Sequence, residues 1–399
     1  MTLIIHSAQK VDADGQVDDF WFASEAGIIT ATGTGTGWRT NVTDSNASAD
    51  NTADTSDTDT TVIDAHGGWL APGFIDLHVH GGGGHAFENG TDEILAALGT
   101  HRSHGTTRSL ISLVSNPVDD LVHNLGVIAD LTASDPLVLG SHLEGPFLSI
   151  GKKGAHDPDA LIEPAPAIVE RLIDASRGTL RQITIAPELP NALEAIEVLV
   201  EAGVVVAVGH TEADADLTRR AFTGGARLVT HVFNAMNGIH HRAPGPVIAS
   251  FEDERVTLEL VLDGHHVHPD VAKLVFEQAP GRVALITDAM AAAGASDGHY
   301  LIGSLDVDVV DGVARLVDGG SIAGSTLTLD HALRLAVEIG IAPSIAVAAL
   351  TSTPARVLGL GHRFGTLTVG HAADAVILDH GWNVRSVFAD GRAIAGAAA

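Results

Sequence analysis

The sequence contains no cysteine and little positive charge. Its 399 residues include 22 basic and 50 acidic side chains, which gives a net charge of -28. Without cysteine, neither disulfides nor thiolate metal sites can form. Any metal ion must therefore be held by histidine, aspartate or glutamate, a donor set that suits zinc, iron or manganese. The negative charge argues against nucleic acid and membrane surfaces as partners, because both are anionic.

Long apolar runs are also missing. No stretch approaches the roughly 20 apolar residues that a membrane span requires. The first ten residues, MTLIIHSAQK, lack the basic segment and apolar run of a signal peptide. We therefore expect a cytoplasmic protein. The chain is long enough for one large barrel and a smaller unit.

Residues 40–61 have the most biased composition of the chain. They are almost entirely Thr, Asp, Asn, Ser and Ala, with no aromatic or basic residue. Such a segment cannot bury apolar surface, so we expect a mobile acidic loop. Calcium binding there is disfavoured, because neither a fixed ligand spacing nor a turn glycine is present.

From residue 74 onward, short apolar runs alternate with amphipathic helical segments. The runs cover residues 74–78, 107–113, 137–143, 182–186, 204–208, 228–231, 257–262 and 283–287. Helical segments such as 92–104, 192–202, 214–224 and 270–278 separate most of them, and 242–254 is the least helix-like interval. Eight strands alternating with helices predict an α/β fold of the (β/α)₈ TIM-like barrel type.

The remaining segments predict additions to the barrel. Residues 300–317, with Asp311-Gly312 at the centre, resemble an inserted β-hairpin. Short strands are expected at both ends of the chain, so we predict a small flanking β domain that both ends build. The expected division is 1–67 for its first part, 68–364 for the catalytic barrel and 365–399 for its second part.

A histidine pair follows the first barrel strand. His78 and His80 are two residues apart, so in an extended chain both imidazoles point to the same side. Gly81–Gly84 follow and let the backbone turn closely around whatever the histidines hold. An H-x-H motif alone is short enough to occur by chance, so its meaning depends on the other polar residues.

Similar side chains occur where other predicted strands end. Glu144 ends the third strand, His210 follows the fifth, His231 ends the sixth and Asp288 follows the eighth. Barrel enzymes place their chemistry at the carboxyl ends of the strands. We therefore expect the histidines and carboxylates to converge at one mouth and to hold a divalent ion.

Each residue alone also has an ordinary structural explanation. Glu144 could form a salt bridge or cap a helix, the histidines could be hydrogen-bonded core residues, and Asp288 could be an N-cap. These explanations require independent coincidences at matching strand ends, so the metal site is the better interpretation. A divalent ion lowers the pKa of bound water to about 7. Asp288 is well placed to move protons, which makes amide hydrolysis the expected reaction class.

Several motifs then show a specific resemblance. HLEGPF (142–147), GAHD (154–157), APE (186–188), VGHT (208–211), THVFNAM (230–236), DGHH (263–266), TDAMAAAG (287–294), AGST (323–326) and GTLTVGHAADAVILD (365–379) occur in order. Together they resemble the N-acetylglucosamine-6-phosphate deacetylase family of the amidohydrolase superfamily. The likeness runs from about residue 67 to residue 392.

The resemblance implies roles for the residues around the metal. Glu144, His210 and His231 match the metal ligands of the family, and Asp288 matches its catalytic acid and base. His78 and His80 match an H-x-H that some members carry and that allows a second ion bridged by Glu144. One or two ions per subunit are thus implied, with zinc first and iron or manganese as alternatives. His156, another implied catalytic residue, and Ala155 match the loop at the sugar and the scissile carbonyl.

The resemblance also implies a sugar-phosphate site. The matching positions are Asn234, Ala235, Arg242, Asp263, His266, Ile322, Ala323 and Gly324. The arginine equivalent to Arg242 reaches the phosphate across a dimer interface in relatives, which implies a homodimer. Arginine also suits a phosphate for its paired donors, although a single loop arginine can equally be solvated. Lys152-Lys153 could add positive charge, but a solvated turn is the expectation.

The resulting hypothesis is hydrolysis of the acetamide of N-acetyl-D-glucosamine 6-phosphate, within amino-sugar catabolism or cell-wall recycling. Two enzyme alternatives are a deacetylase of a related amino-sugar phosphate and a dihydroorotase-like hydrolase of cyclic amides. The latter enzymes bridge their metals with a modified lysine, whereas the four lysines of this chain end no predicted barrel strand. A third alternative is an inactive binding protein, for which Asp288 would have no evident use.

Overall fold

The computed structural model describes residues 2–40 and 60–396. The described residues form two compact units. One is drawn from Met1–Ile75, Arg102–Thr107 and Gly340–Ala399, and the other from Asp76–His101 and Arg108–Ile339. Most of the acidic loop expected at 40–61 lies outside the described residues, but Thr60 and Thr61 begin strand β4. The domain boundaries after residues 67 and 364 stay a prediction.

The first unit is built around one mixed sheet to which both chain ends contribute. Its strands are β1 (Thr2–Asp12), β2 (Gly15–Glu25), β3 (Ile28–Thr34), β4 (Thr60–Asp64), β5 (Trp69–Pro72), β19 (Ala375–Leu378), β20 (Val384–Ala389) and β21 (Arg392–Gly396). The order is β21-β20-β19-β5-β1-β2-β3, with β4 beside β1. Apolar side chains from both ends, such as Ile5, Phe22 and Ile377, share one core. The predicted β unit made from the two chain ends is confirmed.

The barrel lies in the second unit, except for residues 74–75 and 106–107 at the start of two of its strands, which belong to the first unit. Its strands are β6 (Phe74–Asp76), β9 (Thr106–Leu113), β10 (Val138–Glu144), β11 (Leu180–Ile185), β12 (Val205–Val208), β13 (Leu228–Val229), β14 (Thr257–Val261) and β15 (Val283–Ile286). The sheet order is β15-β14-β13-β12-β11-β10-β9-β6. Just beyond its two edges, Val79 and Ala289 form a parallel bridge, and the His80 N–H donates to the Ala289 carbonyl at 2.8 Å. These contacts bring the edges together, so the TIM-like barrel prediction is confirmed.

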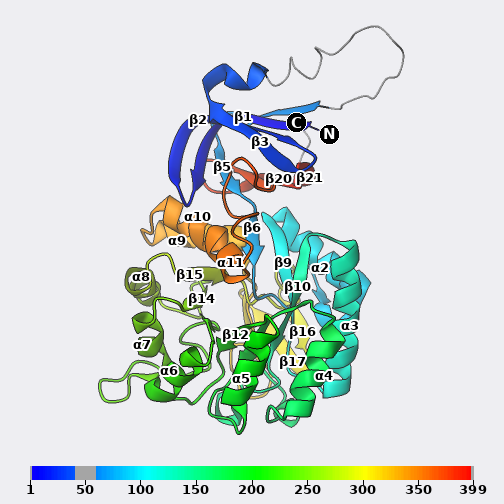
Figure 1. Ribbon diagram of the computed structural model, residues 1–399, viewed down its shortest axis with the longest axis vertical. Coiled ribbons are helices and arrows are strands. Elements are labelled where there is room, and N and C mark those ends of the chain that lie inside the picture. The colour runs from blue at the N-terminus through cyan, green and yellow to red at the C-terminus, as the bar shows by residue number, and fades with distance from the viewer. Residues whose placement is uncertain (1, 41–59, 397–399) are drawn as a thin grey trace. The chain divides into compact units, whose positions relative to one another are not determined.

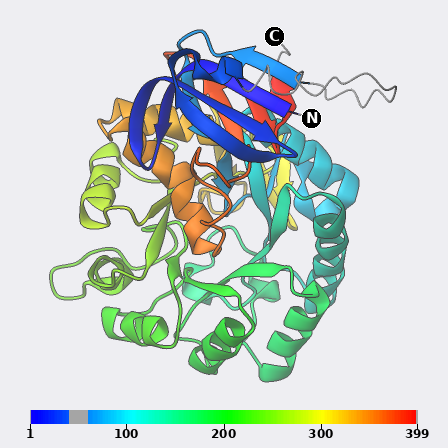
Figure 2. The ribbon, with the colours of Figure 1, turned by 45° about the horizontal axis from the view of Figure 1, so that its top comes forward.

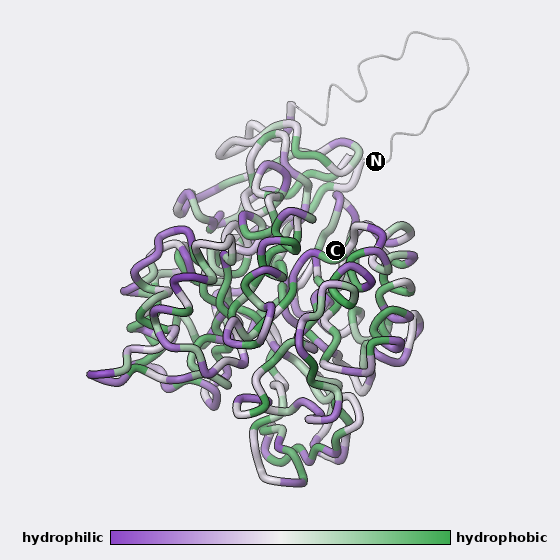
Figure 3. The backbone as a smooth tube through the Cα atoms, turned by 60° about the horizontal axis from the view of Figure 1, so that its bottom comes forward, coloured by the Kyte–Doolittle hydropathy of each residue, from purple (hydrophilic) through white to green (hydrophobic). Residues whose placement is uncertain are grey.

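Helices surround the strands of this unit (Figure 1). They are α2 (Thr91–Ser103), α3 (Val118–Ser134), α4 (Pro166–Ser176), α5 (Ala192–Glu201), α6 (Ala215–Thr223), α7 (Gly245–Glu252), α8 (Pro269–Gln278) and α9 (Leu329–Glu338). Figure 2 shows α2 to α8 arranged around the strands in chain order. The interval at 242–254 does contain a helix, the eight-residue α7. Hydrophobic stretches of the backbone alternate with hydrophilic ones along the chain (Figure 3).

The insertion after β15 differs from the expected hairpin. It is a three-stranded antiparallel sheet of β16 (Gly298–Ile302), β17 (Leu305–Val310) and β18 (Val313–Leu316). Gly303 and Gly312 adopt left-handed φ values of 55° and 75° at its two turns, a conformation that glycine tolerates best. Its apolar face packs on Val114 and Met290, which ties the insertion to the barrel core.

The final helices are α10 (Pro343–Leu350) and α11 (Ser352–Val357), in the first unit. Among the described helices, none combines the length and the apolar character that crossing a membrane requires.

Gly145, directly after β10, tests how tightly this strand end is packed. Its φ is +90°, and an added Cβ would overlap the Ser115 hydroxyl. Gly145→Ala should therefore lower the free energy of unfolding by about 1–3 kcal/mol through combined strain and clash. Denaturant unfolding measures this change.

The matched control is Gly178→Ala. Gly178 has a similar φ of +81°, but an added Cβ there would meet nothing within 4 Å. That variant should carry the left-handed strain alone, about 1 kcal/mol. Equal losses in the two variants would show that packing at Gly145 is looser than described.

Candidate metal centre

Three chemically important residues lie at bends that end barrel strands. His210 follows β12, His231 follows β13 and Asp288 follows β15, and their φ values are 47°, 26° and 49°. Left-handed backbone is unfavourable for residues other than glycine and concentrates at functional sites. Each bend turns a side chain out of its strand, and all three side chains line one pocket. The fold thus uses local strain to direct these groups.

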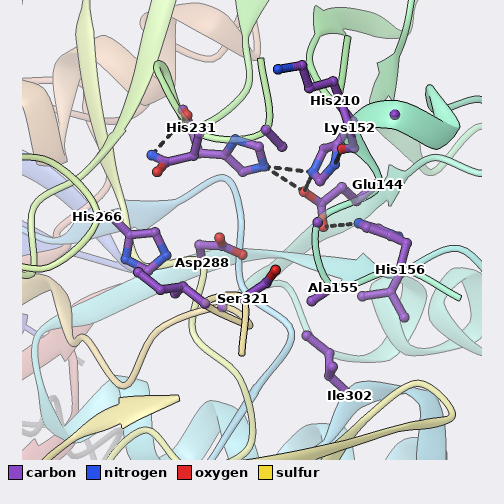
Figure 4. A pocket seen from close by; sticks show the side chains of 17 residues that line it. Glu144, Lys152, Ala155, His156, His210, His231, His266, Asp288, Ile302 and Ser321 are labelled. Atoms are coloured by element: carbon purple, nitrogen blue, oxygen red, sulfur yellow. Dashed lines mark hydrogen bonds and ion pairs between the residues drawn. The ribbon is translucent and has the colours of Figure 1, made fainter. Parts of the chain in front are cut away.

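Glu144, His210 and His231 form the first cluster of donor atoms. Glu144 Oε1 lies 3.0 Å from His210 Nε2 and 2.9 Å from His231 Nε2. The two imidazole nitrogens lie 2.9 Å apart. Figure 4 shows both rings directed at the Glu144 carboxylate. The three residues predicted at different strand ends therefore share one point in space.

A second cluster contains His78, His80, Glu144 and Asp288. His78 Nε2 and His80 Nε2 lie 3.0 Å apart. Glu144 Oε2 lies 3.5 Å and 3.2 Å from these two nitrogens, and Asp288 Oδ1 lies 3.4 Å and 3.5 Å from them. Glu144 thus contributes one oxygen to each cluster.

These separations fit bound divalent ions. Bonds of 2.0–2.2 Å place neighbouring tetrahedral ligands roughly 3.3–3.6 Å apart. The observed donor separations lie in that range or a few tenths of an ångström below it. Paired imidazole nitrogens that face a carboxylate are a typical donor set for zinc, iron or manganese. The first cluster offers three donors, and the second offers four.

The electrostatics of these donor atoms also suit a cation. Burial opposes ionisation of Glu144, yet the nearby imidazoles of His78, His156 and His210 hold its pKa well below the ordinary value. Burial also disfavours a charged His78, but the carboxylates of Glu144 and Asp288 raise its pKa well above the ordinary range. The carboxylates therefore attract positive charge into a buried place, which a divalent ion supplies without added protons.

The two histidines of the first cluster have pKa values shifted in opposite directions. The pKa of His231 is raised, because hydrogen bonding and charge from Glu144 outweigh the effect of burial. Burial lowers the pKa of His210 to about 4, so this ring is neutral at physiological pH. Its Nδ1 lies 2.8 Å from the Lys152 carbonyl, which therefore accepts the ring proton and leaves Nε2 free toward the cluster.

His156 stands beside the clusters without joining either. Its Nδ1 accepts the backbone N–H of Ser115 at 3.2 Å, and its Nε2 lies 3.3 Å from Glu144 Oε2. Because Nδ1 is an acceptor, the ring proton is on Nε2. His156 thus presents a hydrogen-bond donor to the pocket. Figure 4 shows it near Glu144, across the pocket from His266.

The pocket has a volume of about 390 Å³, enough for a small molecule. Most of the expected substrate residues line it, namely Ala155, Asn234, Ala235, His266, Ile322 and Gly324. Ala323 is fully buried between the last two. Asp263 acts through His266: its Oδ2 lies 2.6 Å from His266 Nδ1. Burial opposes the charge of Asp263, but hydrogen bonds from His266 and His265 lower its pKa.

Arg242 and Lys152 differ from simple expectation. Arg242 is exposed, contacts the neighbouring His241 at 2.7 Å and does not belong to the pocket lining of this chain. Lys152, expected in a solvated turn, does line the pocket, and its Nζ reaches the Met236 carbonyl at 3.4 Å. The sequence alone did not indicate that Lys152 lines the pocket, because its position depends on how the loop after β10 folds.

Other lining residues were not predicted. They are Val114, Gly151, Gly154, Ile302 and Ser321. Ile302 and Ser321 belong to the inserted sheet and the segment after it, so the insertion forms part of the pocket wall. Their proximity to the metal ligands follows only from the tertiary fold.

Comparison with known proteins agrees with this geometry. The Amidohydrolase family model matches residues 69–394. An N-acetylgalactosamine-6-phosphate deacetylase from Escherichia coli O157:H7 is 40% identical over 81% of this chain and 87% of the relative. An N-acetylglucosamine-6-phosphate deacetylase from Vibrio furnissii is 35% identical over 82% and 84%.

Solved structures give the same result. The chain matches an N-acetyl-D-glucosamine-6-phosphate deacetylase variant from Mycobacterium smegmatis, in complex with N-acetyl-D-glucosamine-6-phosphate, with a TM-score of 0.88 and 40% identity over 99% of each chain. Fold and site therefore define a barrel hydrolase with a metal-binding donor set. The chain belongs to the amidohydrolase family.

Glu144 belongs to both clusters, whereas His78 belongs to one, so their substitutions should affect metal binding differently. Glu144→Ala should abolish stoichiometric binding of divalent ions, because it removes a donor from both clusters. His78→Ala should retain one ion on Glu144, His210 and His231. Metal analysis of purified variants after zinc loading measures both outcomes.

His85→Ala is the control, since this half-exposed histidine pairs with Glu93 instead. Loss of all metal in His78→Ala would show that the clusters do not bind independently. Affinity should also fall as pH falls, because imidazoles must be neutral to bind metal and the pKa values of His78 and His231 are raised.

Proposed function

We propose that the protein hydrolyses the acetamide of N-acetyl-D-glucosamine 6-phosphate to glucosamine 6-phosphate and acetate. The observation that carries this proposal is the meeting of Glu144, His210, His231 and Asp288 on one small-molecule pocket. The named activities of relatives with 35–40% identity support the substrate class. Such a reaction belongs to the breakdown of amino sugars, including those recycled from cell walls.

The metal and the assembly are part of the proposal. A bound divalent ion, with zinc as the first choice, would activate a water molecule and polarise the acetyl carbonyl. Glu144, His210 and His231 would hold one ion, and His78 with His80 would help to hold a second. We also propose a homodimer. A cytoplasmic location fits a charged sugar phosphate, which does not cross membranes unaided.

Asp288 is the proposed proton carrier. Its side chain is 11% exposed, its Oδ1 is a donor atom of the second cluster, and it lines the same pocket as His210 and His231. There it can accept a proton from the attacking water and deliver it to the nitrogen of the departing amine. Both transfers use the same carboxylate, so the group returns to its starting state after each turnover.

His156 is the proposed partner of the developing oxyanion. Its Nδ1 is committed to the Ser115 N–H, so Nε2 carries a proton on the side of the pocket. A donor held in this way stabilises negative charge as it forms on the acetyl oxygen. The contact between His156 and Glu144 fixes the ring before substrate binds.

The sugar would be held by the opposite wall. Asp263 occupies Nδ1 of His266, which leaves Nε2 to contact the substrate. Asn234 and Ala235 lie in the same lining, and Lys152 supplies positive charge beside them. We propose that this side receives the sugar phosphate, together with Arg242 of the partner subunit.

Two alternative activities can be distinguished from the proposed one. N-acetylgalactosamine 6-phosphate differs from the proposed substrate at one hydroxyl, and the 40% identical relative from Escherichia coli O157:H7 favours it as a second candidate. Acetate release from the two sugar phosphates, measured side by side, decides between them. A cyclic-amide hydrolase is disfavoured, because Glu144 occupies the bridging place of the modified lysine.

Asp288→Asn tests the proton carrier. The amide keeps the shape of the side chain but cannot take up a proton, so turnover should fall about 10²–10⁴-fold. Metal content should stay at one ion or more, because the first cluster does not use Asp288. Acetate release and metal analysis measure the two properties. Near-normal turnover would remove Asp288 from the mechanism.

Arg242→Gln tests recognition of the phosphate. We expect kcat/KM for N-acetylglucosamine 6-phosphate to fall about tenfold or more, since a charge-assisted hydrogen bond is worth about 1.5–3 kcal/mol. Slow hydrolysis of unphosphorylated N-acetylglucosamine should not change. Arg255→Gln is the control, because this exposed arginine pairs with Asp253. Equal losses on both substrates would argue against a phosphate contact.

A further inference from the structure

Glu259 is a charged residue in an unusual place. It lies in the middle of β14, between Leu258 and Leu260, and its side chain is fully buried. A buried carboxylate is costly unless hydrogen bonds and an opposite charge compensate it. The sequence run TLELVL at 257–262 reads as an ordinary core strand, so a purely packing role would be served by an apolar residue.

The contacts of Glu259 cross the barrel interior. Its Oε1 accepts a hydrogen bond from Gln182 Nε2 at 2.7 Å, and its Oε2 lies 3.2 Å from His78 Nδ1. Gln182 is on β11 and His78 follows β6, and neither strand is a neighbour of β14 in the sheet. The three side chains therefore meet inside the barrel, beneath the donor clusters.

This contact decides how His78 presents its ring. With Glu259 Oε2 as the acceptor of this contact, His78 Nδ1 carries the proton. The lone pair is then on Nε2, the atom that lies 3.0 Å from His80 Nε2 and 3.5 Å from Glu144 Oε2. A carboxylate behind an imidazole fixes its tautomer and orientation and makes it a stronger metal donor.

His142, a neighbour of His78, has different hydrogen-bond partners. His142 is equally buried and packs edge-on to His78, with ring centres 4.5 Å apart. Its Nδ1 and Nε2 lie 3.0 Å from the hydroxyls of Ser112 and Thr184. Both of its nitrogens are thus occupied, and it takes no part in either donor cluster.

We propose that Glu259 is a positioning residue that orients His78 for a second metal ion, held by His78, His80, Glu144 and Asp288. The inference rests on the metal centre of the proposed function, but it concerns metal binding and not acetate release. It assigns Glu259 to the second cluster alone, because His210 is oriented by the Lys152 carbonyl instead.

Glu259→Gln tests the proposal with little change in shape. The amide can still hydrogen-bond to Gln182, but it loses the charge that supports His78. Metal-free protein is titrated with zinc against a chromophoric chelator, and bound metal is counted per chain. Wild type should bind two ions. In Glu259→Gln the second ion should bind about 10–100-fold more weakly, while the first keeps its affinity.

Thr184→Val is the matched control. Thr184 lies buried in the same barrel interior and contacts His142 instead of His78, so both ions should bind as in wild type. Glu259→Leu should lower the affinity for the second ion at least as much as Glu259→Gln does. Thermal unfolding of the metal-free variants separates loss of fold from loss of binding.

Three results would overturn the proposal. They are unchanged zinc binding in Glu259→Gln, equal weakening of both ions in that variant, and one ion per wild-type chain at every zinc concentration. The titration is independent of catalysis. A wild-type protein that binds two ions but releases no acetate would refute the proposed function and leave the role of Glu259 intact.

Discussion

The structure of the site depends on one carboxylate. Glu144 is 4% exposed, and it offers one oxygen to His210 and His231 and the other to His78 and His80. A buried anion of this kind is stable only with compensating positive charge. Five imidazoles, including that of His156, surround it and cannot all be protonated without repelling one another. A divalent cation between these groups would supply the compensating charge without crowding protonated rings together.

The barrel makes this crowding possible. Parallel strands bring their carboxyl ends to one edge, so residues from 78 to 288 in the sequence can meet without long connecting loops. Strained bends at His210, His231 and Asp288 then aim the side chains. Beneath them lies a polar layer that includes His142, Gln182 and Glu259 in place of an apolar filling. This layer fixes ring orientation from below, whereas the loops shape the pocket from above.

The sequence was sufficient to predict the fold and which side chains meet where both depend on strand ends. The alternation of apolar runs and helices predicted the barrel, and the residues after each run then had to share a mouth, as Glu144, His210 and His231 do. The sequence was not sufficient where the position of a side chain depends on how the barrel closes or on the course of a loop. Glu259 looks like an interruption of a core strand until the barrel brings it to His78. Lys152 turns inward and the insertion gains a third strand for reasons that local pattern does not contain.

The donor atoms of the centre are nitrogens and oxygens, without sulfur. Ligands of this type bind several first-row divalent ions with modest discrimination, and their relative affinities follow the intrinsic order of the metals. A donor set of this kind would therefore leave the choice of ion to the metals that the surroundings supply. The lack of thiolates has a further benefit during oxidative stress, when such ligands would be converted to sulfenic acids and these imidazoles and carboxylates would persist.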